Sequence, residues 1–206
     1  MTDRPSADSP EAKRRRALAA LLDRPRYEVL PVPGTAEQVG AHVPTTVPVT
    51  VTVSPRRGLE PTLELTEELV RGGYSAVPHL AARLVYDETH LAEILVRLET
   101  TGVREAFVVA GDGKRPVGGF SDSFQLLTAV ARLQRSGLGR KLRSMGVSGY
   151  PEGHPLVTAD ELDRALGAKQ HLSSYVVTQM CFDPGAVLGW IGHARELGVR
   201  LPVHVG

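Results

Sequence analysis

The stretch SAVPHLAARLVYDETHLAEILVRLETTGVREAFVVA, residues 75–110, predicts the fold. Apolar runs typical of buried strands lie at residues 75–80 and 106–110. Between them Asp87 can cap a helix that ends at Gly102. The apolar residues of that helix fall at positions i, i+3, i+4 and i+7: Leu91, Ile94, Leu95 and Leu98. A strand, a helix and a second strand in this order predict a unit of a parallel sheet.

The same alternation continues on both sides of this stretch. Further strands are predicted at residues 27–31, 47–53, 145–150, 175–180 and 199–205. Further helices are predicted over residues 59–71 and 121–134, after the capping box of Thr158 and Glu161, and after Asp183. The spacing of about 25 to 35 residues between successive strands is typical of repeated βα units.

The N-terminal part differs from this pattern. Residues 1–9 are polar and without periodicity, and we expect a disordered lead-in. Ser9 and Pro10 then predict the start of a helix that runs to about Asp23. We expect residues 10–206 to form a single β/α-barrel domain.

Two folds contain such alternating units, the doubly wound sheet and the barrel. The segment VPGTAEQVG, residues 32–40, does not fit the glycine-rich turn of a doubly wound nucleotide-binding sheet. Polar residues instead follow several strands at their carboxyl ends, which is where a barrel keeps its chemistry. We therefore predict a (β/α)8 TIM barrel that is incomplete in this chain, with about seven strands and with the last strand and two helices missing.

Composition excludes several classes of protein. The chain has 206 residues, 42% of them hydrophobic, and 24 Lys+Arg against 23 Asp+Glu. This balance predicts a globular protein with no nucleic-acid partner. The longest apolar run near the N-terminus, residues 17–22, is too short to cross a membrane or to serve as a signal, and the single cysteine, Cys181, is typical of a reducing compartment. We expect a cytoplasmic protein without a metal site.

Four motifs carry a resemblance to a known family. They are YEVLPVP at residues 27–33, PHLAARLV at 78–85, GYPEGHP at 149–155 and VVTQMCFDP at 176–184. In this order and spacing, across residues 27–206, the chain resembles the methylenetetrahydrofolate reductases, and the pairing of the last two motifs is the most specific feature.

The resemblance implies a barrel enzyme of one-carbon and methionine metabolism. It would be an oxidoreductase that reduces 5,10-methylenetetrahydrofolate to 5-methyltetrahydrofolate with NADH or NADPH. The family's cofactor is FAD, which passes hydride from the nicotinamide to the folate. The expected partners are therefore the folate substrate and the nicotinamide.

The resemblance also implies roles for three residues near the reaction. Glu28 matches the catalytic acid, which a buried carboxyl can be if it stays partly protonated. Asp112 matches a carboxylate that stabilises positive charge developing on the substrate. Gln179 matches an amide that binds the pterin. The alternative for Glu28 is a surface glutamate on the first strand, and the alternative for Asp112 is an ordinary turn residue.

Four further residues match family positions that line the flavin. They are Tyr150, His154, Asp163 and Lys169. Lys169 takes this place only if the following turn has lost one residue, and the alternative for His154 is a hydrogen bond within its own turn. His79 is interpreted as an anchor of the third strand.

The chain departs from the family mainly on the flavin side. Ala110 stands where the family has an arginine, TVSPRRG at residues 52–58 replaces a turn of small residues, and HLSS at 171–174 replaces an A-G-A turn. Arg56 or Arg57 could replace the missing cation or occupy the place of the flavin phosphates. We therefore expect flavin binding to be weak or lost.

Two other functions stay open at this point. One is a noncatalytic folate-binding partial barrel that needs a partner segment, and the other is a folate-dependent methyltransferase. Unpaired edges on the first and seventh strands would invite pairing with other chains. We expect residues 1–206 expressed alone to form homo-oligomers or aggregates, or to be inactive.

Overall fold

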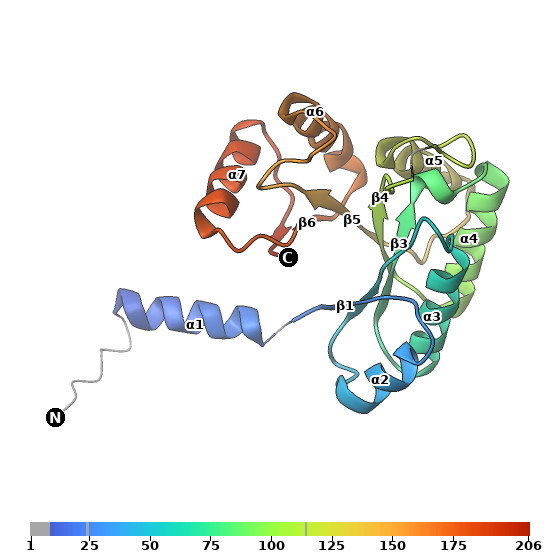
Figure 1. The fold of residues 1–206 in the computed structure, drawn as a ribbon, viewed down its shortest axis with the longest axis horizontal. Coiled ribbons are helices and arrows are strands. Elements are labelled where there is room, and N and C mark those ends of the chain that lie inside the picture. The colour runs from blue at the N-terminus through green and yellow to red at the C-terminus, as the bar shows by residue number, and fades with distance from the viewer. Residues whose placement is uncertain (1–8, 24, 114) are drawn as a thin grey trace.

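Seven parallel strands form one curled sheet in the computed structural model, which describes residues 9–23, 25–113 and 115–206 (Figure 1). Each strand pairs with the next along the chain, whereas a doubly wound sheet would reverse its order. The predicted fold class is confirmed as an incomplete α/β barrel, consistent with a TIM barrel. The strands are β1 (Tyr27–Val29), β2 (Val49–Val51), β3 (Ala76–Ala81), β4 (Glu105–Val109), β5 (Ser144–Gly149), β6 (Tyr175–Thr178) and β7 (Val203–His204).

Helices alternate with these strands and cover the outer face of the sheet (Figure 1). They are α2 (Thr35–His42), α3 (Glu60–Arg71), α4 (Glu88–Thr101), α5 (Ser123–Ser136), α6 (Ala159–Lys169) and α7 (Pro184–Glu196), with short 3-10 helices η1 (Ala82–Leu84) and η2 (Gln170–Leu172). Within the described part of the chain, no helix combines the length and the apolar character needed to cross a bilayer.

The predicted helix caps of α4 and α6 are confirmed. Asp87 accepts a hydrogen bond from the backbone N–H of His90 at 2.8 Å, and Gly102 ends α4 in the left-handed conformation with φ 93°. Thr158 and Glu161 form a complete capping box at the start of α6. Side chains of this kind satisfy backbone N–H groups that have no partner within the helix.

Helix α2 is a feature that the sequence analysis did not predict. It follows Gly34, which offers no side chain for a cap, and buries only Val39. Eight residues without a cap and with one buried side chain give little periodic signal. The helix therefore begins within residues 32–40, the segment that does not fit the glycine-rich turn of a nucleotide-binding sheet.

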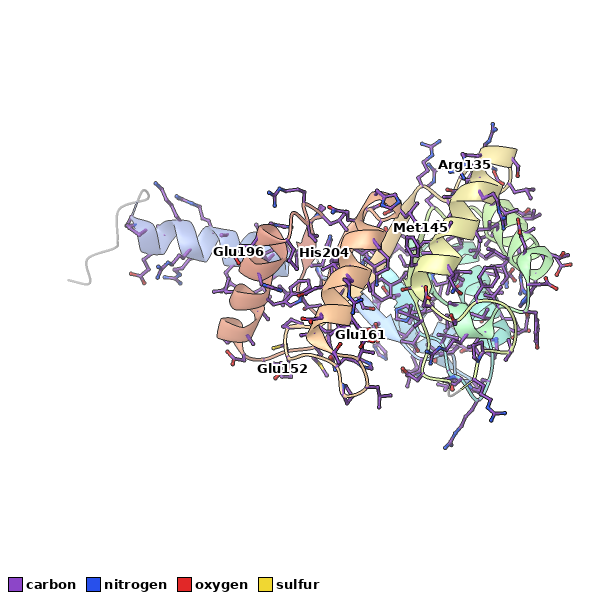
Figure 2. The ribbon with its side chains drawn as sticks, turned by 90° about the horizontal axis from the view of Figure 1, so that it is seen from above. Arg135, Met145, Glu152, Glu161, Glu196 and His204 are labelled. Atoms are coloured by element: carbon purple, nitrogen blue, oxygen red, sulfur yellow. The ribbon has the colours of Figure 1, made fainter. Side chains whose placement is uncertain are left out.

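Helix α1 (Pro10–Leu22) begins where it was predicted, at the cap Ser9, whose hydroxyl accepts from the backbone N–H of Ala12 at 3.1 Å. It buries no residue, and Leu21 and Leu22 are 74% and 69% exposed. Figures 1 and 2, seen from two directions, both show α1 standing apart from the sheet and its helices. The rest of the predicted lead-in, residues 1–8, lies outside the described residues.

The largest core lies between the outer face of the sheet and the helices. Leu80 and Val108 from the strands pack there with Leu91, Leu95 and Leu98 of α4. These three leucines are 0% exposed. Burial of a leucine stabilises a fold by about 1.5–3 kcal/mol, so the apolar stripe that predicted α4 also holds it on the sheet.

The inner face of the sheet is closed at the amino ends of its strands by a polar cluster. Arg26, just before β1, donates to Tyr175 Oη on β6 at 2.8 Å and pairs with Glu105 of β4 at 2.6 Å. Tyr175 Oη also donates to Glu105 at 2.5 Å. A Cβ at Gly146 would lie 2.4 Å from the Tyr175 ring, so this glycine gives the ring its place over β5. The cluster joins β1 to β4 and β6 across the interior.

Candidate active site

The two ends of the sheet are distinct in Figure 2. Glu152, after β5, and Glu161, in the first turn of α6, lie toward one end, whereas Met145, near the start of β5, and Glu196, at the end of α7, lie toward the other. In a parallel sheet covered by helices, the carboxyl ends of strands and the amino ends of helices share one end. That end contains the loops that follow each strand.

Most of the predicted site residues are at or beyond the carboxyl ends of their strands. Glu28 is on β1, Asp112 follows β4, Tyr150 and His154 follow β5, and Gln179 follows β6. Asp163 and Lys169 are instead on α6. The topology therefore brings the first five to one end of the barrel, from four different strands.

Glu28 faces the inner side of the sheet. In the register it pairs with Thr50 of β2, and its Oε2 lies 3.6 Å from Nε2 of His79 on β3. This contact is slightly too long for a hydrogen bond. Although 62% of the Glu28 side chain is exposed, partial desolvation beside the inner face raises the pKa of its carboxyl. A raised pKa favours the protonated acid.

His79 is a direct neighbour of Glu28, whereas the sequence analysis interpreted it only as an anchor of the third strand. Its side chain is 13% exposed, and its ring centroid lies 4.8 Å from that of Phe107 on β4. Burial lowers the pKa of His79 to about 4, so the imidazole is neutral at neutral pH. The neighbour of Glu28 is therefore a neutral ring, which adds no positive charge that would lower the pKa of the carboxyl.

Thr50 is a residue that the sequence analysis missed. It is 5% exposed, and among the described residues its hydroxyl is the buried side-chain polar atom that has no hydrogen-bond partner. A buried hydroxyl without a partner usually costs about 1–3 kcal/mol. The signal available in the sequence was its inward position in the alternation of β2. Thr50 adds an unused donor and acceptor beside Glu28.

Asp112 lies in an exposed turn between two glycines. Gly111 has φ +92°, a left-handed conformation that favours glycine, and a Cβ there would lie 3.1 Å from the Cβ of Ala81. Arg83 donates from Nη1 to the carbonyl oxygen of Gly113 at 3.0 Å. The turn is thus held against the end of β3, and the Asp112 carboxylate is left in solvent.

Tyr150 and His154 form a pair after β5. Their ring centroids are 5.2 Å apart and the rings are nearly perpendicular. His154 Nδ1 accepts from the backbone N–H of Leu156 at 3.2 Å, so a neutral ring carries its proton on Nε2. The hydrogen bond within the turn, which was the alternative for His154, is present, and it leaves Nε2 as a donor.

Gln179 begins the loop after β6. Its backbone N–H donates to the Gly149 carbonyl at 2.7 Å, and the residue is exposed. Unusually exposed apolar side chains stand in the loops that follow β1, β5 and β6: Leu30 (63%), Leu156 (87%), Met180 (69%) and Phe182 (88%). Large apolar side chains in these loops are available to contact a bound ligand. The sequence analysis did not identify these exposed side chains.

Asp163 and Lys169 both lie on α6 but contact different helices. Asp163 Oδ2 lies 2.7 Å from Nε2 of His193 on α7, and this contact raises the pKa of His193. Lys169 is 8% exposed, and its Nζ reaches only Ser123 Oγ, at 3.4 Å. Among the described residues no carboxylate lies within ion-pair distance of Lys169. Burial lowers the pKa of Lys169, and the negative charge of Asp122 offsets part of this shift. A buried ammonium with one weak contact suits an anion.

Replacing Lys169 with Met is expected to raise the free energy of unfolding by about 1–2 kcal/mol at pH 7, because the change removes a buried charge whose desolvation outweighs its attraction to Asp122. The lowered pKa means that the folded state releases this proton before the unfolded chain does. Wild-type stability should therefore rise with pH from the folded pKa toward 10.5, and K169M should lack this rise. Urea unfolding at several pH values measures both effects, with exposed Lys141→Met as the control. A less stable K169M at pH 7 would contradict the prediction.

Comparison with known proteins identifies the family. The family model "Methylenetetrahydrofolate reductase" matches residues 34–206. The chain belongs to the methylenetetrahydrofolate reductase family. A curated relative, "Methylenetetrahydrofolate reductase 1" of Schizosaccharomyces pombe, is 26% identical over 121 residues, which cover 54% of this chain and 19% of the relative. The chain thus aligns with about a fifth of that reductase.

Solved structures support the barrel fold of this family member. A putative lyase/mutase from Burkholderia cenocepacia J2315 superposes with a TM-score of 0.57 at 16% identity, over 95% of this chain and 73% of the other. The carboxyl transferase domain of Rhizobium etli pyruvate carboxylase, solved with 3-bromopyruvate, gives a TM-score of 0.53 at 12% identity, over 88% and 35%. At such low identities the likeness shows the fold alone.

Proposed function

We propose that this protein reduces 5,10-methylenetetrahydrofolate to 5-methyltetrahydrofolate, with NADH or NADPH as the source of hydride. Membership of the reductase family supports the reaction class. The observation that carries the proposal is Glu28, a carboxyl with a raised pKa on the inner face of β1, beside the neutral His79. A raised pKa and a neutral neighbour both favour the protonated form that a carboxyl general acid must have.

Glu28 supplies the proton that opens the methylene bridge. Protonation of a bridge nitrogen breaks its bond to the methylene carbon and leaves an iminium, whose carbon then accepts hydride. The raised pKa keeps a larger fraction of Glu28 protonated than an ordinary carboxyl would have. His79, on one side of the carboxyl, has a neutral imidazole and therefore adds no positive charge that would lower this pKa.

Two other residues act on the substrate around this acid. The Asp112 carboxylate, in the turn after β4, stabilises the positive charge of the iminium. Gln179, after β6, offers an amide donor and acceptor to the pterin ring. Leu156 and Phe182, the most exposed apolar side chains in the loops that follow β1, β5 and β6, are available to pack against a planar ring.

Three of the residues that match flavin-lining positions offer groups that suit a flavin. The buried Lys169 suits a phosphate, because among the described residues no carboxylate lies within ion-pair distance of its ammonium, which leaves the ammonium able to donate a charge-assisted hydrogen bond. His154 Nε2 is left as a donor, and Tyr150 offers an aromatic ring beside it. When bound, a flavin would relay hydride from the nicotinamide to the folate. NAD(P)H could otherwise transfer hydride directly.

FAD is expected to bind about 10- to 150-fold more weakly than a site with one more phosphate contact would bind it. Ala110 stands where the family has a cation, and a hydrogen bond to a charged group contributes about 1.5–3 kcal/mol. Absorbance of flavin that survives gel filtration at low micromolar protein measures this. Ala110→Arg should tighten binding by restoring the cation, and stoichiometric flavin on the unmodified chain would contradict the expectation.

The reductase assay tests the function itself. Purified protein is mixed with 5,10-methylenetetrahydrofolate and NADH or NADPH, with and without added FAD, and oxidation of the nicotinamide is followed by absorbance. The expected result is oxidation that depends on the folate. Folate binding without oxidation under any of these conditions would reject the reductase and favour a binding protein or a methyltransferase.

A further inference from the structure

The loop between β4 and α5 contains Asp112 but has little apolar anchorage. Asp112 and residues 115–119 are exposed. Phe120, at the end of the loop, packs against the main core, and Ser123 begins α5. A segment without buried apolar side chains depends on hydrogen bonds for its shape. The partners of those bonds therefore decide where Asp112 lies.

One residue, Arg83 of η1, makes four of these hydrogen bonds. Its backbone N–H donates to Ala110 O at 3.0 Å, and its carbonyl accepts from Val117 N at 2.9 Å. Its guanidinium donates from Nη1 to Gly113 O at 3.0 Å and from Nε to Ser121 O at 2.9 Å. Asp112 thus lies between two residues, Ala110 and Gly113, that are both bound to Arg83.

Arg83 is itself held firmly. Ala81 and Ala82, which precede it, are both 0% exposed, so the backbone from which it reaches the loop is fixed in the core. The loop also passes close to the segment after η1, because a Cβ at Gly118 would lie 1.7 Å from Tyr86 O. The loop and η1 therefore form one packed unit with Arg83 at its centre.

We propose that Arg83 is a positioning residue that fixes the Asp112 turn for hydride transfer. This inference rests on the proposed function. The guanidinium acts through the backbone of the loop. Its Nη1 orients the carbonyl of Gly113, the residue after Asp112, and its Nε anchors the far end of the loop at the Ser121 carbonyl. Misplacement of a charged group by about 1 Å can cost about 100-fold in rate, so a loose turn would lose much of the stabilisation that Asp112 gives.

The test compares Arg83→Met and Arg83→Lys with a matched control. Arg195→Met is that control, because Arg195 also donates to two carbonyl oxygens, those of Val199 and Leu201, at the opposite end of the sheet. We expect R83M to lower kcat by about 10- to 100-fold with KM for the folate changed by less than about threefold. R83K, which keeps the charge but not the two-point geometry, should stay below about a third of wild-type kcat, and R195M should keep wild-type kcat.

A double mutant separates positioning from a direct role. If Arg83 acts through Asp112, R83M should lower kcat no further in a D112N background than D112N does alone. Independent, multiplicative losses would overturn the proposal, as would wild-type kcat in R83M. Both comparisons use the full chain.

Hydrogen exchange distinguishes this proposal from the proposed function. Amides of residues 111–113 and 117–121 should exchange faster in R83M than in the wild type, and this measurement needs no activity. Unchanged exchange there would overturn the role of Arg83 whether or not the enzyme is active. A wild-type chain without reductase activity would instead reject the proposed function.

Discussion

Glu28→Gln is expected to lower reductase turnover by about 10²- to 10⁴-fold, the range typical of a lost general acid. The amide keeps the size of the side chain and its place beside His79, but it has no acidic proton to give. Affinity for the folate should change by no more than a few-fold. Steady-state kinetics with nicotinamide oxidation, together with a folate titration, measures both quantities.

Two further measurements make this prediction specific. Glu37→Gln, an exposed glutamate on α2, is the control and should keep full turnover. Because the protonated form of Glu28 is the active one, wild-type turnover should fall as pH rises through its raised pKa, and the remaining turnover of E28Q should not follow that fall. If E28Q retains more than about a third of wild-type turnover, Glu28 is not the acid.

Acidification from pH 6.5 to pH 4 is expected to remove about 3 kcal/mol of stability through His79 alone. Burial lowers the pKa of His79 from 6.5 to about 4 in the folded state. The unfolded chain therefore takes up this proton near pH 6.5, whereas the folded protein does so only near pH 4. The contribution is fully present above pH 6.5 and is lost as pH falls through this window.

His79→Gln should remove that part of the pH dependence. The free energy of unfolding, measured with urea at pH 7 and at several lower values, should fall less steeply in H79Q than in the wild type. The value at pH 7 is the internal reference, because it records the packing lost with the ring against Phe107. Parallel curves for the two proteins would show that His79 is not held neutral.

Glu28 is expected to change the free energy of unfolding with pH in the direction opposite to His79. A carboxyl with a raised folded pKa binds its proton more tightly in the folded state, so its contribution is lost as pH rises through that pKa. The two neighbours therefore partly offset each other on acidification. Measuring H79Q in the E28Q background isolates the histidine, since the amide that replaces the Glu28 carboxyl does not titrate.

The sequence alone was enough for the elements that local pattern controls. The stripe of Leu91, Leu95 and Leu98 predicted α4 because apolar side chains at helical spacing must share a face, and the cap at Asp87 and Gly102 defined its ends. Seven strands in βα alternation predicted the barrel. Helix α2 was missed because a helix of eight residues without a side-chain cap has almost no such pattern.

Contacts between strands were decided only by the tertiary structure. Motifs placed Glu28 at the end of the first strand, but its approach to His79 depends on the register of β1, β2 and β3. The same register buries Thr50 without a partner. The burial that lowers the pKa of His79 comes from residues distant in the chain, as does the clamp of Arg83 on the Asp112 loop. Short-range periodicity specifies which residues share a face, whereas desolvation and hydrogen bonding depend on which faces meet in space.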